Sequence, residues 1–376
     1  MLDEITRAVL ARDDVARYLK ASGHVDLQVK EKIHAYLDEL RTTQRYPLYK
    51  RLKHPLYPIL RKVDRQAEHI EIVRKALSVG RVIYISNHKS HLDYLIEPLV
   101  LEDSAVRPPI IAAGINLFGG PLGLIHRHVT GAIPVRRDAK DPAYLVTLKA
   151  YVAELLQHRD LLFYLEGGRS YSGELKMPKT GLLHAALQAD RREEIAVVPT
   201  AIAYDLVLED RILAHQGAKR RQRPFAREVA EMVGTAVGYR TRAFVTFGAP
   251  IPLAGWNPDS RRDVMALAHA TRDAIGRQHK VLPTAIVAHV LRPSLRMADL
   301  PPRITTLLET LDRAGANLDI ADPQTVAERG VGALEARGVV VRERNLIRVR
   351  DRMVLRYYGR TLDHLFNRPK RPSRTH

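Results

Sequence analysis

Residues 82–95 read VIYISNHKSHLDYL, and this stretch decides the class of fold. It opens with VIYIS, residues 82–86, a run that is apolar up to Ile85 and is typical of a strand buried on both faces of a parallel sheet. Polar residues follow at once, from Asn87 to His91, and an apolar segment begins after them. A strand that ends in polar residues before a helix is the place where α/β folds carry their functional groups.

More runs of strand length occur on either side of this stretch, and helix-like segments alternate with them. The further strand candidates are Ile110–Ala113, Ala132–Val135, Leu161–Glu166, Ile195–Ile202 and Ala243–Phe247. Residues 144–156 show the clearest helical spacing of apolar residues. The alternation predicts an α/β domain over residues 76–285, in which helices flank a mostly parallel sheet.

The segments that flank this domain have different patterns. Residues 1–75 predict an N-terminal helical extension, and residues 286–376 predict a C-terminal helical extension with a short hairpin at residues 338–351. Two helices and a hairpin are also the parts of a winged-helix module, so a basic nucleic-acid-binding protein is the alternative from another functional class. The alternating arginines of the hairpin fit a strand with solvated outer positions equally well.

The composition is that of a globular protein with a basic excess. Of 376 residues, 45% are hydrophobic and 27% are charged, and 60 Lys and Arg against 42 Asp and Glu give a net charge of +18. Such a charge attracts nucleic acid, anionic lipid or acidic proteins, although an arginine-rich proteome explains part of it.

The absence of cysteine excludes disulfides, thiolate metal sites and a cysteine nucleophile. No run reaches the roughly 18 apolar residues of a membrane-spanning helix, and the N-terminus lacks a signal-peptide pattern.

One segment has the character of a membrane interface. Residues 45–62 read RYPLYKRLKHPLYPILRK, with six Lys and Arg, no acidic residue, and Tyr and Leu between the charges. This mixture suits a lipid headgroup region, while three prolines exclude a single long amphipathic helix. A proline-broken connector packed on the next domain explains the segment equally well.

The sharpest chemical signal is the pair His88 and Asp93. Five residues of an ideal helix turn through roughly 140°, so the two side chains meet only if His88 lies in the turn and the helix starts after it. Ser90 and Asp93 form a capping-box-like start that favours this arrangement. The carboxylate would then fix the tautomer of the imidazole, which suits a general base acting on a substrate hydroxyl.

Two other interpretations of these residues stay open. In the first, Asp93 only caps the helix. In the second, His88, His91 and Asp93 bind a metal, with His126 or His128 as a further ligand, because a catalytic zinc needs three protein ligands.

Two loops with basic residues follow other strands of the predicted sheet. Arg136 and Arg137 come after one strand, and paired arginines can clamp a phosphate. The strand LLFYL is followed by Glu166-Gly167-Gly168-Arg169-Ser170, whose backbone N–H groups and Arg169 could form an anion cradle. A glycine turn with a surface arginine explains each loop taken alone. Together with His88, they predict transfer from an activated donor to the hydroxyl of a phosphorylated small molecule.

In order and spacing, these segments resemble the four blocks of the glycerolipid acyltransferases. That family has an H-x4-D motif, a Gly/Arg block, an E-G-G-R-S block and a proline-bearing strand, matched here by Val198-Pro199-Thr200. The resemblance runs from about residue 80 to 255 and is closest to the bacterial membrane-associated glycerol-3-phosphate acyltransferases. It includes GINLFGGPLG at residues 114–123, PKTG at 178–181 and FGAPIPL at 247–253.

The resemblance implies a role for each matched residue. His88 would be the general base and Asp93 its orienting partner, with direct attack on the acyl thioester and no acyl-enzyme. The substrate-binding residues would be Arg136, Arg137, Glu166, Gly167, Arg169 and Ser170. Pro199 would lie in the acyl-donor region. The resemblance implies no metal and no cofactor, since acyl-CoA or acyl carrier protein is the donor substrate.

We therefore expect an enzyme of phospholipid biosynthesis that moves a fatty acyl group to the hydroxyl of glycerol 3-phosphate. The block AIPVRR lacks the aromatic residues that the family places before the arginines, and Tyr171 stands where the family tends to have a second basic residue. Dihydroxyacetone phosphate and lysophosphatidate are therefore alternative acceptors. We expect a peripheral protein on the cytoplasmic side of the cell membrane, attracted to its anionic surface, without a transmembrane helix and without a nucleic-acid partner.

Overall fold

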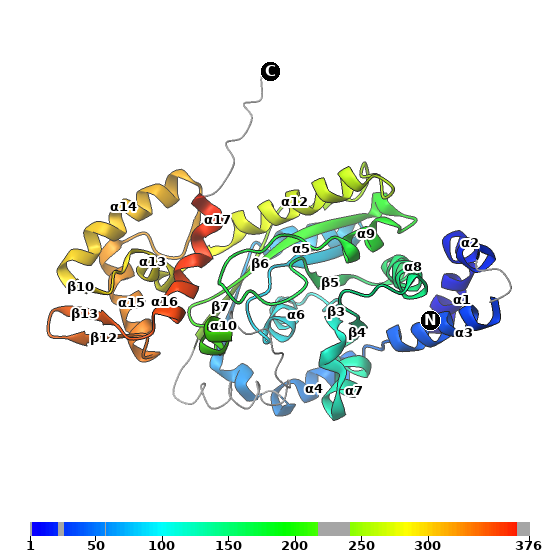
Figure 1. Cartoon of the computed structure of the whole chain (residues 1–376), viewed down its shortest axis with the longest axis horizontal. Coiled ribbons are helices and arrows are strands. Elements are labelled where there is room, and N and C mark those ends of the chain that lie inside the picture. Colours follow the sequence, from blue (N-terminus) through cyan, green and yellow to red (C-terminus); the bar gives the residue numbers. More distant parts are fainter. Residues whose placement is uncertain (1, 22–25, 57, 217–240, 367–376) are drawn as a thin grey trace, which may run out of the picture.

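The computed structural model describes residues 2–21, 26–56, 58–216 and 241–366. Within this part of the chain, eight strands form one sheet at the centre of the molecule (Figure 1). Their order is β1-β7-β6-β2-β5-β3-β4, and β8 lies beside β6. The strands are β1 (Val63–Glu68), β2 (Arg81–Ser86), β3 (Ile110–Gly114), β4 (Ala132–Val135), β5 (Leu161–Tyr164), β6 (Ile195–Tyr204), β7 (Thr241–Phe247) and β8 (Ile251–Pro252).

The sheet is mostly parallel, which confirms the predicted fold class. Strand β2 runs parallel to both β5 and β6, and β3 runs parallel to β4 and β5. Strands β7 and β8 are antiparallel to β6. Because parallel strands end at the same edge of a sheet, the segments that follow β2, β3, β4 and β5 gather there.

Strand β1 has no counterpart among those predicted. Residues 63–68 lie in the region expected to be helical, but they form β1 and pair in parallel with β7 at the edge of the sheet. Their sequence, VDRQAE, is polar apart from Val63 and Ala67, so it lacks an apolar run. This strand is defined by its backbone pairing with β7. Backbone pairing at the edge of a sheet does not require a pattern of apolar residues, so the sequence carries no signal for it.

Helices cover both faces of the sheet. Val82 and Tyr84 of β2 belong to one core cluster, which includes helix α6, and Ile83 and Ile85 belong to the other, which includes α8 and α12. This alternation is what a strand buried on both faces requires. The helices up to this point are α1 (Leu2–Ala11), α2 (Asp13–Ala21), α3 (Asp26–Leu40), α4 (Tyr46–Leu56), α5 (Ile70–Val79), α6 (Asp93–Asp103), α7 (Gly120–His128), α8 (Pro142–His158), α9 (Gly181–Leu187), α10 (Asp210–Gln216) and α12 (Arg261–Gln278).

The N-terminal helices and the C-terminal segment lie at opposite ends of the molecule (Figure 1). Helices α1, α2 and α3 pack on α8. The C-terminal segment contains the predicted hairpin, which β10 extends to an antiparallel sheet of order β10-β13-β12. Its elements are β9 (Lys280–Val281), α13 (Pro283–Val290), β10 (Ser294–Arg296), α14 (Leu300–Arg313), β11 (Asn317–Leu318), α15 (Pro323–Ala336), β12 (Val340–Glu343), β13 (Leu346–Val349), α16 (Arg352–Gly359) and α17 (Asp363–Phe366).

Two sequence expectations concern the membrane. Across the described ranges, no helix combines the length and the apolar character that a membrane span requires. The basic segment at residues 45–62 forms helix α4 over Tyr46–Leu56 and a 3₁₀ helix over Pro58–Lys62, and Tyr57 lies outside the described residues.

Candidate active site

The turn between β2 and α6 carries His88, and two side-chain contacts fix it to the sheet. The Asn87 amide donates to the carbonyl of Ile202 in β6 (3.0 Å), and the N–H of Ile202 donates back to Asn87 Oδ1 (2.8 Å). Helix α6 starts at Asp93, after His88, as the spacing of the two residues predicted. Asn87 therefore holds the turn against the sheet at the carboxyl end of β2.

His88 and Asp93 are in direct contact. His88 Nδ1 lies 2.8 Å from Asp93 Oδ2, and the same oxygen accepts from the backbone N–H groups of Lys89 (2.7 Å) and Ser90 (3.0 Å). Capping of the turn and orientation of the imidazole were alternatives at the level of sequence. In the structure one carboxylate oxygen does both.

The contact defines the protonation state of the imidazole. A carboxylate only accepts hydrogen bonds, so Nδ1 carries the hydrogen and Nε2 keeps its lone pair. Burial lowers the pKa of His88 to about 4, although the Asp93 carboxylate acts in the opposite direction. The ring is therefore neutral at neutral pH, and Nε2 is ready to accept a proton.

Two further side chains, the partly buried Tyr164 and the buried Glu97, lie close to this pair. The Tyr164 ring is stacked on the His88 ring, with centroids 4.1 Å apart. Glu97 accepts a hydrogen bond from Ser86, and burial, followed by the charge of Asp93, raises the pKa of Glu97 well above its ordinary value. The surroundings of Glu97 therefore favour its protonated form.

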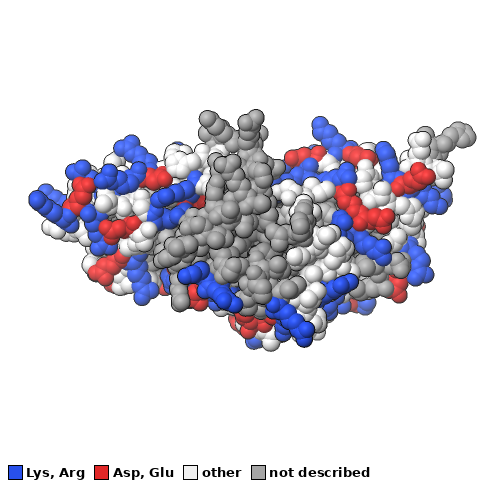
Figure 2. Space-filling model, turned by 90° about the horizontal axis from the view of Figure 1, so that it is seen from below, with Lys and Arg blue, Asp and Glu red and all other residues white. Residues whose placement is uncertain are grey.

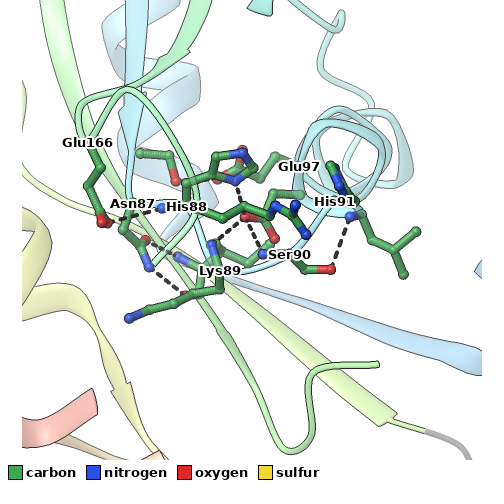
Figure 3. A network of polar contacts seen from close by, with 12 residues as sticks. Asn87, His88, Lys89, Ser90, His91, Glu97 and Glu166 are labelled. Atoms are coloured by element: carbon green, nitrogen blue, oxygen red, sulfur yellow. Dashed lines mark hydrogen bonds and ion pairs between the residues drawn. The ribbon is translucent and has the colours of Figure 1, made fainter. Parts of the chain in front are cut away.

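The E-G-G-R-S loop is bonded to the turn (Figure 3). Glu166 Oε1 accepts from the N–H of His88 (3.2 Å), and Oε2 accepts from the N–H of Lys176 (3.3 Å). The N–H of Ser170 donates to the carbonyl of His88 (2.9 Å), while its hydroxyl donates to the carbonyl of Glu174 (2.7 Å). The side chain of Glu166 and the backbone N–H of Ser170 thus hold the loop against the turn, and the resemblance assigns both residues to substrate binding.

Gly167 and Arg169 differ in what they contribute to this loop: Gly167 allows its backbone conformation, and Arg169 forms an ion pair. Gly167 has a φ of +64°, and a Cβ there would lie 3.0 Å from Lys179 Cγ, so glycine suits both the backbone and the space. Arg169 is buried, with Nη1 3.5 Å from Oε1 of Glu209 and its guanidinium over the Tyr171 ring. Arg169 therefore lies beside the turn that carries His88, opposite the carboxylate of Glu209.

Arg137 reaches this loop from the end of β4. Its Nη1 lies 3.6 Å from the position that a Cβ would take at Gly168. Lys176 Nζ donates to the carbonyl of the same glycine (2.9 Å). The second and third sequence blocks therefore meet, with Arg137 exposed at the surface of the site.

Arg136 points elsewhere, although the sequence grouped it with Arg137 as a substrate-binding residue. Its Nε donates to Glu39 Oε1 of α3 (2.8 Å), and its guanidinium covers the rings of Tyr36 and Tyr144. Consecutive residues at the end of a strand project in opposite directions, so one arginine faces the site and its neighbour faces the N-terminal helices.

Three residues around the site were missed by the sequence reasoning. Lys176 lies close to Arg137, Tyr204 contacts Asp93, and Glu209 bonds the turn through the N–H of His91 (2.6 Å). Tyr204 and Glu209 follow or end β6, which is again the carboxyl edge of the sheet. Their position after a strand is a signal that could have found them, but nothing in their spacing distinguishes them from structural residues.

The remaining sequence hypotheses concern a metal and Pro199. Among the described residues, no three His, Asp or Glu side chains are grouped in a way that could hold a metal ion. Pro199 is buried inside β6, at the point where the neighbour of that strand changes from β8 to β7. It belongs to the sheet and not to the loops that surround His88.

Comparison with known proteins agrees with this arrangement. The acyltransferase family matches residues 63–203. The plsB1 protein of Mycobacterium tuberculosis is 30% identical over 324 residues, which are 81% of this chain and 50% of that protein. The glycerol-3-phosphate acyltransferase of Actinobacillus succinogenes is 34% identical over 57% of this chain and 28% of its own length. That of Pasteurella multocida is 29% identical over 80% of this chain and 42% of its own length.

A mostly parallel sheet with an H-x4-D turn at its carboxyl edge, within residues that match this family, defines an acyltransferase domain. Residues 63–203 match the acyltransferase family, and the chain is similar to relatives named glycerol-3-phosphate acyltransferase. It spans half or less of the length of the curated relatives that it matches.

Proposed function

We propose that this chain transfers a fatty acyl group from a thioester donor to the hydroxyl of glycerol 3-phosphate. The observation that carries the proposal is the 2.8 Å contact between His88 Nδ1 and Asp93 Oδ2, which leaves Nε2 as a base. Relatives named glycerol-3-phosphate acyltransferase support the choice of acceptor.

In the proposed reaction, His88 Nε2 takes the proton of the acceptor hydroxyl while the oxygen attacks the thioester carbonyl. A C–O bond forms, the C–S bond breaks, and the imidazolium returns its proton to the leaving thiolate. Asp93 stabilises the imidazolium between these steps. We propose direct transfer; the hydroxyl of Ser90, two residues from His88, donates to Glu209 Oε2 at 2.9 Å.

Arg137 would bind the phosphate of the acceptor. The guanidinium fork pairs well with phosphate oxygens, and Gly168 beside it has no side chain to fill the space. Lys176 adds a positive charge next to the same loop. Arg169 forms an ion pair with Glu209, which offsets its positive charge. We therefore propose that Arg137 makes the main contact with the phosphate of the acceptor.

The donor is acyl-CoA or acyl carrier protein in this proposal, and no further cofactor takes part. Both donors are anionic, and a net charge of +18 favours their approach.

We also propose peripheral binding to the anionic, cytoplasmic side of the membrane, in the service of phospholipid biosynthesis. In Figure 2, the face below the sheet shows more Lys and Arg than Asp and Glu among its described residues. Helices α4 and α7 lie near this face, with Leu48 37% and Leu124 63% exposed. The segment before α4 is tied to the end of α7, since the N–H of Arg45 donates to the carbonyl of Val129 (3.1 Å).

Sedimentation with vesicles tests this binding. Leu124→Glu should reduce binding to vesicles rich in phosphatidylglycerol, whereas Leu27→Glu, at an equally exposed leucine of α3, should leave it unchanged. Equal binding of both variants would move the membrane contact to another surface.

The nucleic-acid alternative has less support. The exposed positions of α15, the helix that a winged-helix protein would lay in a groove, include Gln324, Glu328 and Arg329. In the hairpin, Arg348 and Arg350 pair with Glu343 at 3.0 and 3.4 Å. Neither element presents the concentrated positive charge that binding to a phosphate backbone needs.

An acceptor panel tests the proposed function. Purified protein is given acyl-CoA or acyl carrier protein with glycerol 3-phosphate, dihydroxyacetone phosphate or lysophosphatidate, and the products are identified by mass. We expect lysophosphatidate from glycerol 3-phosphate. If only another acceptor is acylated, that compound replaces glycerol 3-phosphate as the assigned substrate. If no acyl group is transferred and the protein binds duplex DNA tightly and in a salt-sensitive way, the nucleic-acid-binding hypothesis is favoured.

A further inference from the structure

We propose that Tyr204 is a positioning residue of this active site, which holds the Asp93 carboxylate in the orientation that His88 requires. The proposal rests on the acyl transfer proposed above and adds a residue to its machinery. Tyr204 ends β6 and lies 111 positions from Asp93 in sequence, and its hydroxyl donates to Asp93 Oδ1 at 2.7 Å.

The two oxygens of Asp93 are held in different ways. Oδ2 takes three N–H donors, all from the turn that begins at His88. For Oδ1, the described residues provide a single donor, the hydroxyl of Tyr204. Asp93 is 0% exposed and Tyr204 is 7% exposed, so water has little access to replace this bond.

The hydrogen bond from Tyr204 therefore fixes the orientation of the Asp93 carboxylate. Without it, a buried, charged oxygen would lack a donor, and the carboxylate would either rotate or take up a proton. Either change would disturb the line from Oδ2 to His88 Nδ1. The general base would then lose the partner that orients it and that stabilises its protonated form.

Among the described residues, no other neighbour of Asp93 donates to Oδ1. The titratable groups that face it come from the turn and from α6, β5, β6 and α16: His88, Lys89, Glu97, Tyr164, Tyr204 and Tyr357. Lys89 Nζ donates to the carbonyl of Gly173 (2.6 Å), and Tyr164 lies over the His88 ring. Burial raises the pKa of Tyr204 well above its ordinary value, so its hydroxyl retains the proton that it donates.

The experiment compares two tyrosines that differ in one respect. Tyr84 of β2 is also buried, but its hydroxyl has no hydrogen-bond partner among the described residues, so Tyr84→Phe is the matched control. We expect Tyr204→Phe to lower kcat roughly 10- to 100-fold, with KM for glycerol 3-phosphate within about twofold of the wild-type value. Kinetics equal to those of Tyr84→Phe would overturn the proposal.

The pH profile separates positioning from a general loss of packing. Without its donor, the Asp93 carboxylate no longer stabilises the protonated imidazole, so the acid limb of kcat/KM should move to lower pH in Tyr204→Phe. Substitution of Tyr204 by 3-fluorotyrosine, which keeps the volume and donates more strongly, should move the limb the other way. An acid limb that stays in place in both variants would contradict the proposal, and the fluorinated protein remains informative if Tyr204→Phe does not fold.

A second readout does not depend on catalysis. In protein with labelled histidine, the His88 imidazole is assigned through its loss in His88→Gln, and the pH at which it takes up a proton is followed by NMR. We expect this pH to be lower in Tyr204→Phe than in Tyr84→Phe, because the disturbed carboxylate no longer stabilises the imidazolium. If the wild-type chain transfers no acyl group, the proposed function fails, but this shift still tests Tyr204, and its absence refutes the positioning role.

Discussion

Arg137 and Gly168 come from loops that follow different strands, yet the guanidinium of Arg137 lies against the space where a side chain at Gly168 would begin. The separation from Nη1 to that Cβ position is 3.6 Å, and Cζ and Nη2 lie at 3.8 and 3.9 Å. Lys176 Nζ is bonded to the carbonyl of the same glycine at 2.9 Å. Positive charge and a position without a side chain thus coincide at one point beside the turn that carries His88, as a phosphate site needs.

Gly168→Ala tests this space. The new methyl would be in ordinary van der Waals contact with Arg137, so we expect the protein to fold and to keep its stability. The methyl would, however, occupy the place of the phosphate, and KM for glycerol 3-phosphate should rise about tenfold with little change in kcat. Gly181→Ala is the control, since nothing lies within 4 Å of its Cβ position. An unchanged KM in Gly168→Ala would place the phosphate elsewhere.

Arg137 and Arg136 are neighbours with different expected effects. Arg137→Gln should raise KM for the acceptor by at least about tenfold, because a charge-assisted contact with phosphate is lost. Arg136→Gln should leave KM unchanged and lower stability by less than about 1 kcal/mol, since its bond with Glu39 is partly exposed to solvent. Steady-state kinetics and urea unfolding measure both. A larger rise of KM in Arg136→Gln than in Arg137→Gln would reverse the assignment.

The pH dependence follows from the burial of His88. Its pKa is lowered to about 4, so the imidazole stays neutral well below the usual value of 6.5. The proposed base is active when neutral, and kcat/KM should therefore hold as pH falls below 6.5 and decline only as pH approaches 4. Measurement between pH 4 and 8, in the range where the protein stays folded, checks this. An acid limb centred at pH 6.5 or higher would disagree with a buried base.

Gly173 joins the E-G-G-R-S loop to the C-terminal helix α16. A Cβ there would lie 1.9 Å from the carbonyl oxygen of Tyr357, and φ is +87°. Gly255 has the same φ of +87° but an open space, so Gly255→Ala measures the backbone strain alone, about 1–2 kcal/mol. We expect Gly173→Ala to be destabilised further in urea unfolding, by at least about 2 kcal/mol more. Equal losses in the two variants would mean that the loop does not depend on α16.

The sequence was sufficient to predict the core of the fold. Central parallel strands are buried on both faces, so β2 and β5 appear as apolar runs, and the rule that such strands end at one edge predicted which loops meet. β1 was missed because an edge strand such as VDRQAE is defined by its ladder to β7 and not by apolar residues.

The site was predicted less completely than the fold. His88 and Asp93 are close in sequence, so spacing alone predicted their contact. Tyr204 and Glu209 reach the same turn from more than 100 residues away, and only the folded sheet brings them there. Arg136 and Arg137 point in opposite directions because of the way β4 ends. Two consecutive arginines in a sequence do not show which of them faces the site.

The most direct measurement is the rate of acyl transfer to glycerol 3-phosphate by His88→Gln, with His91→Gln as the neighbouring control. A general base at His88 predicts that His88→Gln lowers kcat about 1000-fold while circular dichroism stays unchanged, and that His91→Gln retains most of the activity. A metal site would instead make both variants inactive and make activity depend on added zinc. A His88→Gln protein that works within tenfold of the wild-type rate would contradict the account.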